Sequence, residues 1–170
     1  MRLLAIIGAL AILIGGAAAI FFFGGFFSVA GSYDDPPPVA WALVHVRQAS
    51  IARHAVDTPP QSLGDATLVR AGARAFAQRG CVACHGGPGA DWAKFSEGMN
   101  PSPPDLSEVV DTLEPSQLFW VVKNGIRMTG MPSFGAIGVA DPELWSIVAF
   151  LKQLPHVSPE DFKAWSQPAP

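Results

Sequence analysis

The sequence predicts an all-α protein that begins with an N-terminal transmembrane helix. An uncharged apolar run extends from Leu3 to Ala30, and the rest of the chain carries helix-start and helix-stop signals built on Asp, Pro and Gly. No strand pattern competes with them. The 170 residues suffice for one compact domain and an anchor, but not for two sizeable cores.

The uncharged run is long enough to cross a bilayer. At about 1.5 Å per helical residue, it exceeds the roughly 30 Å of bilayer hydrocarbon. A cleaved secretory signal is the alternative, with an apolar region of about 7–15 residues and a small-residue cleavage site. Ala17 to Ala19 resemble such a site, but phenylalanines continue the apolar run beyond it. We therefore expect an uncleaved signal-anchor over residues 1–30.

Charge on either side of the anchor predicts its orientation. Arg2 is the only charge on the N-terminal side, so the positive-inside rule places the N-terminus in the cytoplasm. The sequence thus predicts a single-pass protein of the cytoplasmic (inner) membrane, with the remaining chain on the periplasmic side. Ala11, Gly15 and Ala19 form a small-residue stripe that would admit another transmembrane helix, although Gly and Ala are common in all such helices.

Residues 31–61 read as a linker that contains a short helix. Pro36 to Pro38 form a stiff break, and a helix is expected from Val39 to Val56. His45 and His54 lie nine residues apart and therefore on different faces, which is typical of surface histidines. With a net charge of -3, the chain has no basic face for nucleic acid.

A series of three capped helices is predicted over residues 62–157. The helices are expected at Asp65 to Arg79 before Gly80, at Pro115 to Asn124 before Gly125, and from Asp141 to a point before Pro155. In the third, Leu144, Ile147, Val148 and Leu151 should point inward.

Two irregular segments complete the chain. Residues 86–105 are rich in Gly, Pro and Ser, which indicates a loop wrapped around another group. The tail, residues 158–170, offers only Phe162 and Trp165 as anchors and is expected to be partly disordered.

The sequence Cys81-Val82-Ala83-Cys84-His85 fits the pattern C-x-x-C-H. Thiols at i and i+3 can bond the two vinyl groups of a haem while the next residue reaches the iron. A thioredoxin-like redox pair would need a βαβ setting, and a zinc site would need two further paired ligands. A structural disulfide between Cys81 and Cys84 is the remaining alternative.

Met131 is the best candidate for a second iron ligand. It follows Gly130 and precedes Pro132, a setting that can present a thioether from a loop. Core filling is the alternative role for Met131, and Met128 and Met99 are rival ligands.

Several of these features together resemble class I cytochromes c, and the resemblance covers about Ser62 to Pro155. It is carried by the Cys81–His85 motif, Gly72 and Phe76 before it, Pro104-Asp105-Leu106 after it, Gly125-Ile126 with Met131-Pro132, and Leu144-Trp145. The resemblance implies a cytochrome c fold around one covalent haem c.

Specific roles follow from the resemblance. It implies thioethers at Cys81 and Cys84, with His85 and Met131 as the two iron ligands. The Pro104 carbonyl would accept the other ring proton of His85, although Pro101 and Pro103 are close by. The first and last helices of the domain would cross at Gly72 and Phe76 against Trp145 and Phe150.

The expected function is one-electron transfer, because two filled axial positions leave no open site for a substrate. One reading is a tethered carrier between a quinol-oxidising complex or periplasmic dehydrogenase and a terminal oxidase or another cytochrome. The alternative is a fixed haem subunit of a larger membrane complex. Either way, the expected partners are membrane lipid and other redox proteins or subunits, with no small-molecule substrate. An enzyme such as a peroxidase, or a sensor, would need the distal ligand to leave.

Overall fold

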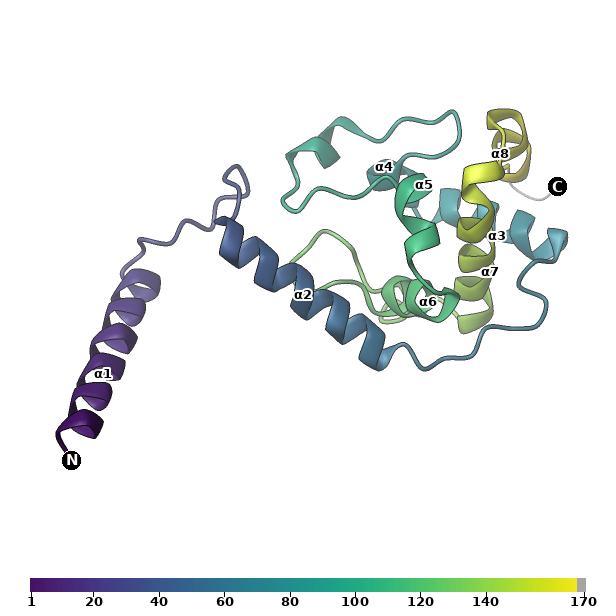
Figure 1. Ribbon diagram of the computed structural model, residues 1–170. Coiled ribbons are helices and arrows are strands. Elements are labelled where there is room, and N and C mark those ends of the chain that lie inside the picture. Colours follow the sequence, from purple (N-terminus) through teal and green to yellow (C-terminus); the bar gives the residue numbers. More distant parts are fainter. Residues whose placement is uncertain (168–170) are drawn as a thin grey trace. The chain divides into compact units, whose positions relative to one another are not determined.

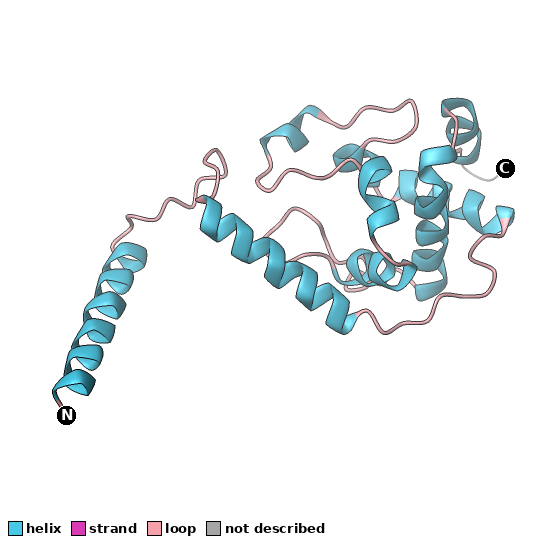
Figure 2. Ribbon diagram, viewed as in Figure 1, coloured by secondary structure: helices cyan, strands magenta, loops and turns pink. Residues whose placement is uncertain are grey.

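The computed structural model describes residues 1–167, and every regular element in that range is a helix, which confirms the all-α prediction (Figures 1 and 2). Within it, only an isolated bridge between Gly87 and Ala90 has β character. The chain divides into two compact units, residues 1–34 and the part from Asp35 onward. The boundaries expected within the second unit, at residues 61 and 157, stay a prediction.

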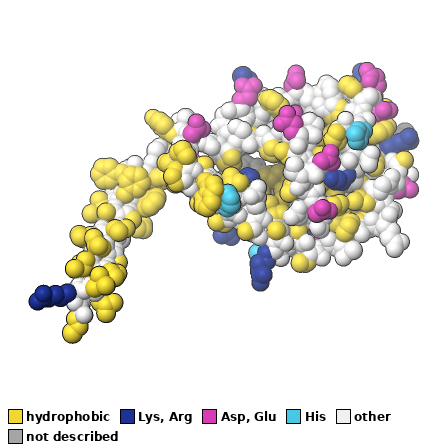
Figure 3. Space-filling model, viewed as in Figure 1, with side chains coloured by type: hydrophobic (Ala, Val, Ile, Leu, Met, Phe, Trp, Pro, Cys, Tyr) yellow, Lys and Arg dark blue, Asp and Glu magenta, His cyan; other side chains and the backbone are white. Residues whose placement is uncertain are grey.

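The first unit consists mainly of helix α1, Arg2–Phe23. Hydrophobic side chains cover it along its length, and Arg2 supplies a charge near its start (Figure 3). All residues of α1 are exposed within the chain. It is the one described helix that is long and apolar enough to cross a membrane, which indicates a single-pass anchor.

The second unit is built around the crossing of α3, Ala66–Gln78, and α7, Asp141–Gln153. Asp65 caps α3 by accepting hydrogen bonds from two backbone N–H groups. At the crossing, a Cβ on Gly72 would overlap the backbone carbonyl of Ser146 and lie 2.9 Å from Cβ of Phe150. Glycine therefore permits an approach that no other residue allows.

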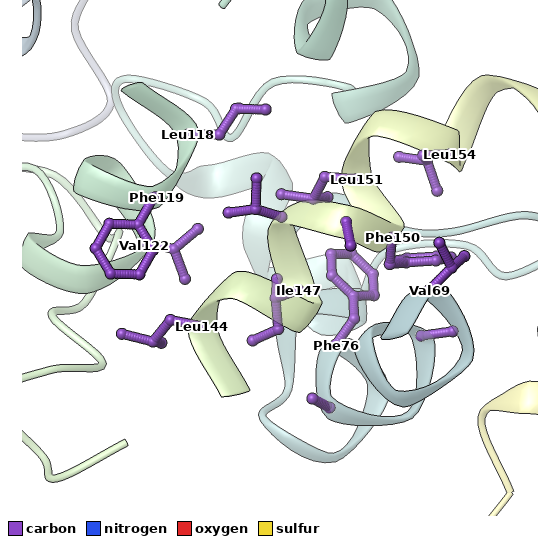
Figure 4. Close-up of a cluster of buried hydrophobic side chains, with 14 of the residues drawn as sticks. Val69, Phe76, Leu118, Phe119, Val122, Leu144, Ile147, Phe150, Leu151 and Leu154 are labelled. Carbon is purple, nitrogen blue, oxygen red and sulfur yellow. The ribbon is translucent and has the colours of Figure 1, made fainter. Parts of the chain in front are cut away.

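The aromatic partners at this crossing differ in part from those expected. Phe76 packs on Phe150 with ring centroids 5.3 Å apart, as predicted. Trp145 instead stacks on Phe119, with centroids 4.0 Å apart and planes 9° from parallel. Phe119 belongs to α6, so this stack joins α6 to α7. Figure 4 shows this core, with Leu144, Ile147 and Leu151 of α7 between the other helices.

Helix α6 has the bounds expected from the sequence, Pro115–Asn124. Glu114 and Gln117 form a capping box at its start. Gly125 ends it with a φ of 67°, a conformation that favours glycine. The turn at Gly125 then leads directly into the loop that carries Met131.

The expectation of a partly disordered tail is wrong for residues 159–165. They form helix α8, Pro159–Trp165, capped by the Ser158 hydroxyl. Phe162 of α8 is buried and stacks on Phe150, with centroids 5.6 Å apart. Residues 168–170 lie outside the described residues. Before α8, the 3-10 helix η3, Leu154–His156, continues α7.

Helix α2, Pro37–His54, belongs to the same compact unit and contacts α6. Ile51 is its one buried residue. The ring of His54 stacks on Trp120, with centroids 6.0 Å apart. His45 and His54 are both exposed and each contacts the backbone carbonyl four residues earlier. The prediction of surface histidines is therefore confirmed.

Shorter elements lie within the segment between α3 and α6. They are α4, Cys81–His85; η1, Lys94–Gly98; α5, Leu106–Val109; and η2, Val110–Thr112. The segment 86–105 is otherwise irregular, as its composition predicts.

Candidate functional site

The two cysteines lie on one short helix that follows directly from the core. Gly80, with a φ of 79°, ends the α3 segment and is the N-cap of α4. Cys81 and Cys84 are three positions apart on α4, which places them on the same side of one helical turn. Both are half-buried free thiols. This helical turn can thus present both sulfur atoms to the same planar ligand, as haem attachment requires.

Three features of the structure bear on the alternatives to haem attachment at Cys81 and Cys84. Burial raises the pKa of the Cys81 thiol to about 12. Redox-active cysteines show the opposite shift, because they react as thiolates. Among residues 1–167, no group of three or more His, Cys, Asp or Glu side chains is arranged to hold a metal ion. The cysteines are also unbonded to each other, so the disulfide alternative is not realised here.

His85 is oriented by the backbone of the loop that follows it. Its Nδ1 lies 2.9 Å from the Pro104 carbonyl oxygen, the contact expected from the sequence. Since a carbonyl oxygen only accepts, Nδ1 is the donor, and in the neutral ring the lone pair is then on Nε2. This arrangement leaves Nε2 available to a metal and fixes the ring, as in metal sites where the second nitrogen is hydrogen-bonded.

The same loop is tied to the motif helix at a second point. The Ala93 N–H donates to the Ala83 carbonyl at 2.8 Å, and Gly87 and Ala90 exchange backbone hydrogen bonds. Of the three nearby prolines, only Pro104 has a carbonyl in contact with His85 among the described hydrogen bonds. This contact therefore distinguishes Pro104 from Pro101 and Pro103 as the partner of His85.

The Met131 loop is held by its backbone rather than by side-chain packing alone. The Ile126 N–H donates to the Met131 carbonyl at 3.2 Å, and the Met131 N–H donates to Oγ1 of Thr129 at 3.1 Å. A Cβ on Gly125 would lie 2.7 Å from the Met131 carbonyl oxygen. Met131 itself is half-buried and packs against the hydrophobic core.

The rival methionines occupy different settings. Met128 is 91% exposed, which places it away from any buried group. Met99 is half-buried, and its side chain packs against Gly130, beside Met131. Met131 therefore remains the preferred ligand, with Met99 next to its loop.

Two hydroxyl residues support this loop and were not singled out from the sequence. Thr129 accepts from the Met131 N–H, and Oγ of Ser133 donates to the Lys123 carbonyl at 2.8 Å. The Ala136 N–H in turn donates to Ser133. Their position on either side of Gly-Met-Pro, together with the tendency of Ser and Thr to bond nearby backbone, is a signal that could have identified them.

A cavity of about 300 Å³ lies beside His85. Its walls come from residues 86–92, from Asp105 and Ser107, and from the segment 154–157. Cys81, Cys84 and Met131 do not line it. Of the five predicted site residues, only His85 lines this cavity.

Taken as a donor set, these residues fit a covalently bound haem. Two thiols share one helical turn, an oriented imidazole has Nε2 available, and a thioether sits on a fixed loop at the edge of an apolar core. The attachment and ligation roles of Cys81, Cys84, His85 and Met131 stay a prediction.

Comparison with known proteins extends over the same region. Residues 67–151, half of the chain, match a family described as cytochrome c oxidase, cbb3-type, subunit III. The matched segment runs from α3 to α7 and includes the Cys81–His85 motif and Met131. No curated protein and no solved structure matches the chain.

Proposed function

Because the chain belongs to the cytochrome c oxidase, cbb3-type, subunit III family of c-type cytochrome domains, we propose that it transfers single electrons through one covalent haem. The observation that carries the proposal is the pairing of His85 with the Pro104 carbonyl directly after two thiols on one helical turn. A bound haem supplies reversible one-electron oxidation and reduction at its iron.

The chain's own residues have distinct tasks in this proposal. Cys81 and Cys84 would form the thioethers, and His85 would bind the iron through Nε2 while the Pro104 carbonyl holds its ring. Met131 would be the second iron ligand, and Thr129 and Gly125 fix the loop that carries it. With two protein ligands on the iron, a substrate would find no open position, so electron transfer would be the remaining chemistry.

Carbon monoxide distinguishes this function from a peroxidase or a sensor. A held Met131 excludes the gas from reduced wild-type protein at neutral pH, whereas Met131→Ala opens the sixth position and binds it. The readout is the optical spectrum before and after addition of the gas. Rapid binding to wild-type protein would favour an enzyme or sensor and contradict the proposal.

For the cellular role we propose a single-pass protein of the cytoplasmic membrane with the haem domain on the periplasmic side. It would pass electrons between a quinol-oxidising complex or a periplasmic dehydrogenase and a terminal oxidase or another cytochrome. The apolar α1 supports the tether, and a tether raises the local concentration of a weakly binding partner.

A fixed haem subunit of a larger membrane complex is the second candidate. It is favoured by the description of the matched family as an oxidase subunit and by the short connection between α1 and α2, residues 24–36. Purification in mild detergent separates the two candidates. A fixed subunit brings stoichiometric partner chains with it, whereas a carrier is recovered alone.

A further inference from the structure

The first half of α2 exposes apolar side chains to an unusual extent. From Pro37 to Val46 every residue is apolar except His45. Trp41, Leu43 and Val46 are 63%, 54% and 66% exposed. A run of exposed large apolar residues on one element marks a contact surface rather than an ordinary solvated face.

Three of these residues form a single face, here called the α2 stripe. Val39, Leu43 and Val46 recur at i, i+4 and i+7, so they lie one above another along the helix. Ile51, the buried residue of α2, follows Val46 by five positions, which is about 140° around the helix axis. The α2 stripe therefore lies to one side of the face that buries Ile51, with Leu43 about 80° and Val46 about 140° from it around the axis.

The charges on α2 suggest what covers this stripe. The helix contains Arg47 and Arg53 but no Asp or Glu, whereas the whole chain has a net charge of -3. Arg47 lies one turn beyond Leu43 and Arg53 two turns beyond Val46, so the two guanidinium groups flank the stripe at its C-terminal end. Within residues 1–167 neither forms a salt bridge. An apolar face bordered by free cations suits an anionic lipid surface.

The length of chain before α2 keeps this helix close to a bilayer. Only residues 24–36 separate the end of α1 from the start of α2. Thirteen residues span at most about 45 Å when fully extended. If α1 crosses the membrane, α2 begins within reach of its surface.

We propose that α2 lies in the interface of the membrane that α1 crosses. The α2 stripe faces the acyl chains, and Arg47 and Arg53 contact anionic headgroups. The proposal rests on the anchoring by α1 proposed above, but not on the haem. Because Ile51 joins α2 to the cytochrome domain, an α2 held at the surface fixes the height of that domain above the bilayer.

The test uses the full haem-loaded chain in vesicles of neutral lipid with an added anionic lipid. A nitroxide label is attached at Leu43→Cys on the stripe or, as a matched control, at the exposed Gln48→Cys five positions along the same helix. Collision rates with oxygen, which partitions into lipid, and with a water-soluble nickel complex are compared. Labelling of the unsubstituted chain reports any thiol left free at Cys81 or Cys84, and flotation with the vesicles reports anchoring by α1.

The expected ratio of oxygen to nickel collisions is several-fold higher at position 43 than at position 48. Removing the anionic lipid, or combining Arg47→Gln with Arg53→Gln, is expected to lower the ratio at position 43. Equal, water-like ratios in protein that floats with the vesicles would overturn the inference while leaving the anchor intact. Shielding of position 43 from both reagents would overturn it in favour of a protein contact. Failure to float would refute the anchoring itself.

Discussion

A methyl group at Gly72 is expected to destabilise the cytochrome unit, because α3 and α7 cross there in direct backbone contact. The added Cβ of Gly72→Ala would lie 2.5 Å from the Ser146 carbonyl carbon, where ordinary contacts begin at 3.4 Å. The Ser146 carbonyl oxygen would be closer still, so the two helices must separate by roughly 1.5 Å. The neighbouring atoms are backbone and the Cβ of Phe150, so no flexible side chain can yield.

The size of the effect follows from two opposing contributions. Overpacking against a rigid neighbour costs about 3 kcal/mol, the upper part of its usual range. Alanine recovers about 1 kcal/mol through its higher helix propensity. The net loss of about 2 kcal/mol in free energy of unfolding should lower the Tm of a unit of this size by roughly 6–10 °C.

Thermal unfolding followed by circular dichroism measures this shift in the haem-loaded full chain. Gly64→Ala is the matched control, because a Cβ at Gly64 meets no atom within 4 Å. The control should unfold within about 2 °C of the wild type. If Gly72→Ala also unfolds within that interval, the close crossing does not exist in solution.

Three further perturbations test the site and the core. Gly125→Ala should displace the Met131 loop and weaken the Met-to-iron charge-transfer band, because the new Cβ would lie 2.7 Å from backbone atoms. Gly130→Ala is the control: its Cβ would meet only a flexible side chain, so the band should be preserved. Phe162→Ala should cost about 3 kcal/mol in chemical denaturation, because α8 loses its one buried aromatic ring, and a change below about 1 kcal/mol would show that α8 does not pack on the core. The backbone N–H groups that donate to the Asp65 carboxylate lower its pKa in the folded state. The ionised carboxylate therefore stabilises the fold above its ordinary pKa of 3.8, and this stabilisation is lost as the pH falls below that value and through the lowered pKa. Asp65→Asn should therefore lower the Tm at pH 7 and approach the wild type in strong acid; an equal deficit at both pH values would contradict a charge effect.

The helices that could be predicted from sequence are those with local signals at both ends. Pro115 begins α6 and Gly125 ends it, and both act through their own backbone preferences, so the bounds agree with the structure. The crossing at Gly72 was predicted through the resemblance to class I cytochromes c, and the contact of its Cβ position with the Ser146 backbone agrees.

The remaining elements depend on contacts between distant parts of the chain. Helix α8 is seven residues long, too short for a periodic pattern, and it is held through Phe162 by an aromatic core from other helices. The stacking of Trp145 on Phe119 rather than at the α3 crossing likewise depends on how α6 is placed. The local sequence pattern therefore predicts neither helix α8 nor the stacking of Trp145 on Phe119.

The features of the candidate site likewise fall into those that the local sequence predicts and those that only the fold shows. The spacing of Cys81, Cys84 and His85 is a local feature and is readable directly. Pro104 was chosen among three prolines through the resemblance, but its contact with His85, nineteen positions away, is visible only in the fold. The support of Met131 by Thr129 and Ser133 was missed, since hydroxyl residues in a loop have many possible partners.

The central claim is that Cys81 and Cys84 hold one haem whose iron is bound by His85 and Met131. Its most direct test compares oxidised and reduced optical spectra of the wild type and of Met131→Ala, together with a denaturing gel stained for covalent haem. The account predicts that haem stays on both chains and that only the variant loses the Met-to-iron charge-transfer band. A wild-type chain without covalent haem would contradict the claim, and retention of the band in the variant would transfer the ligand role to Met99 or Met128.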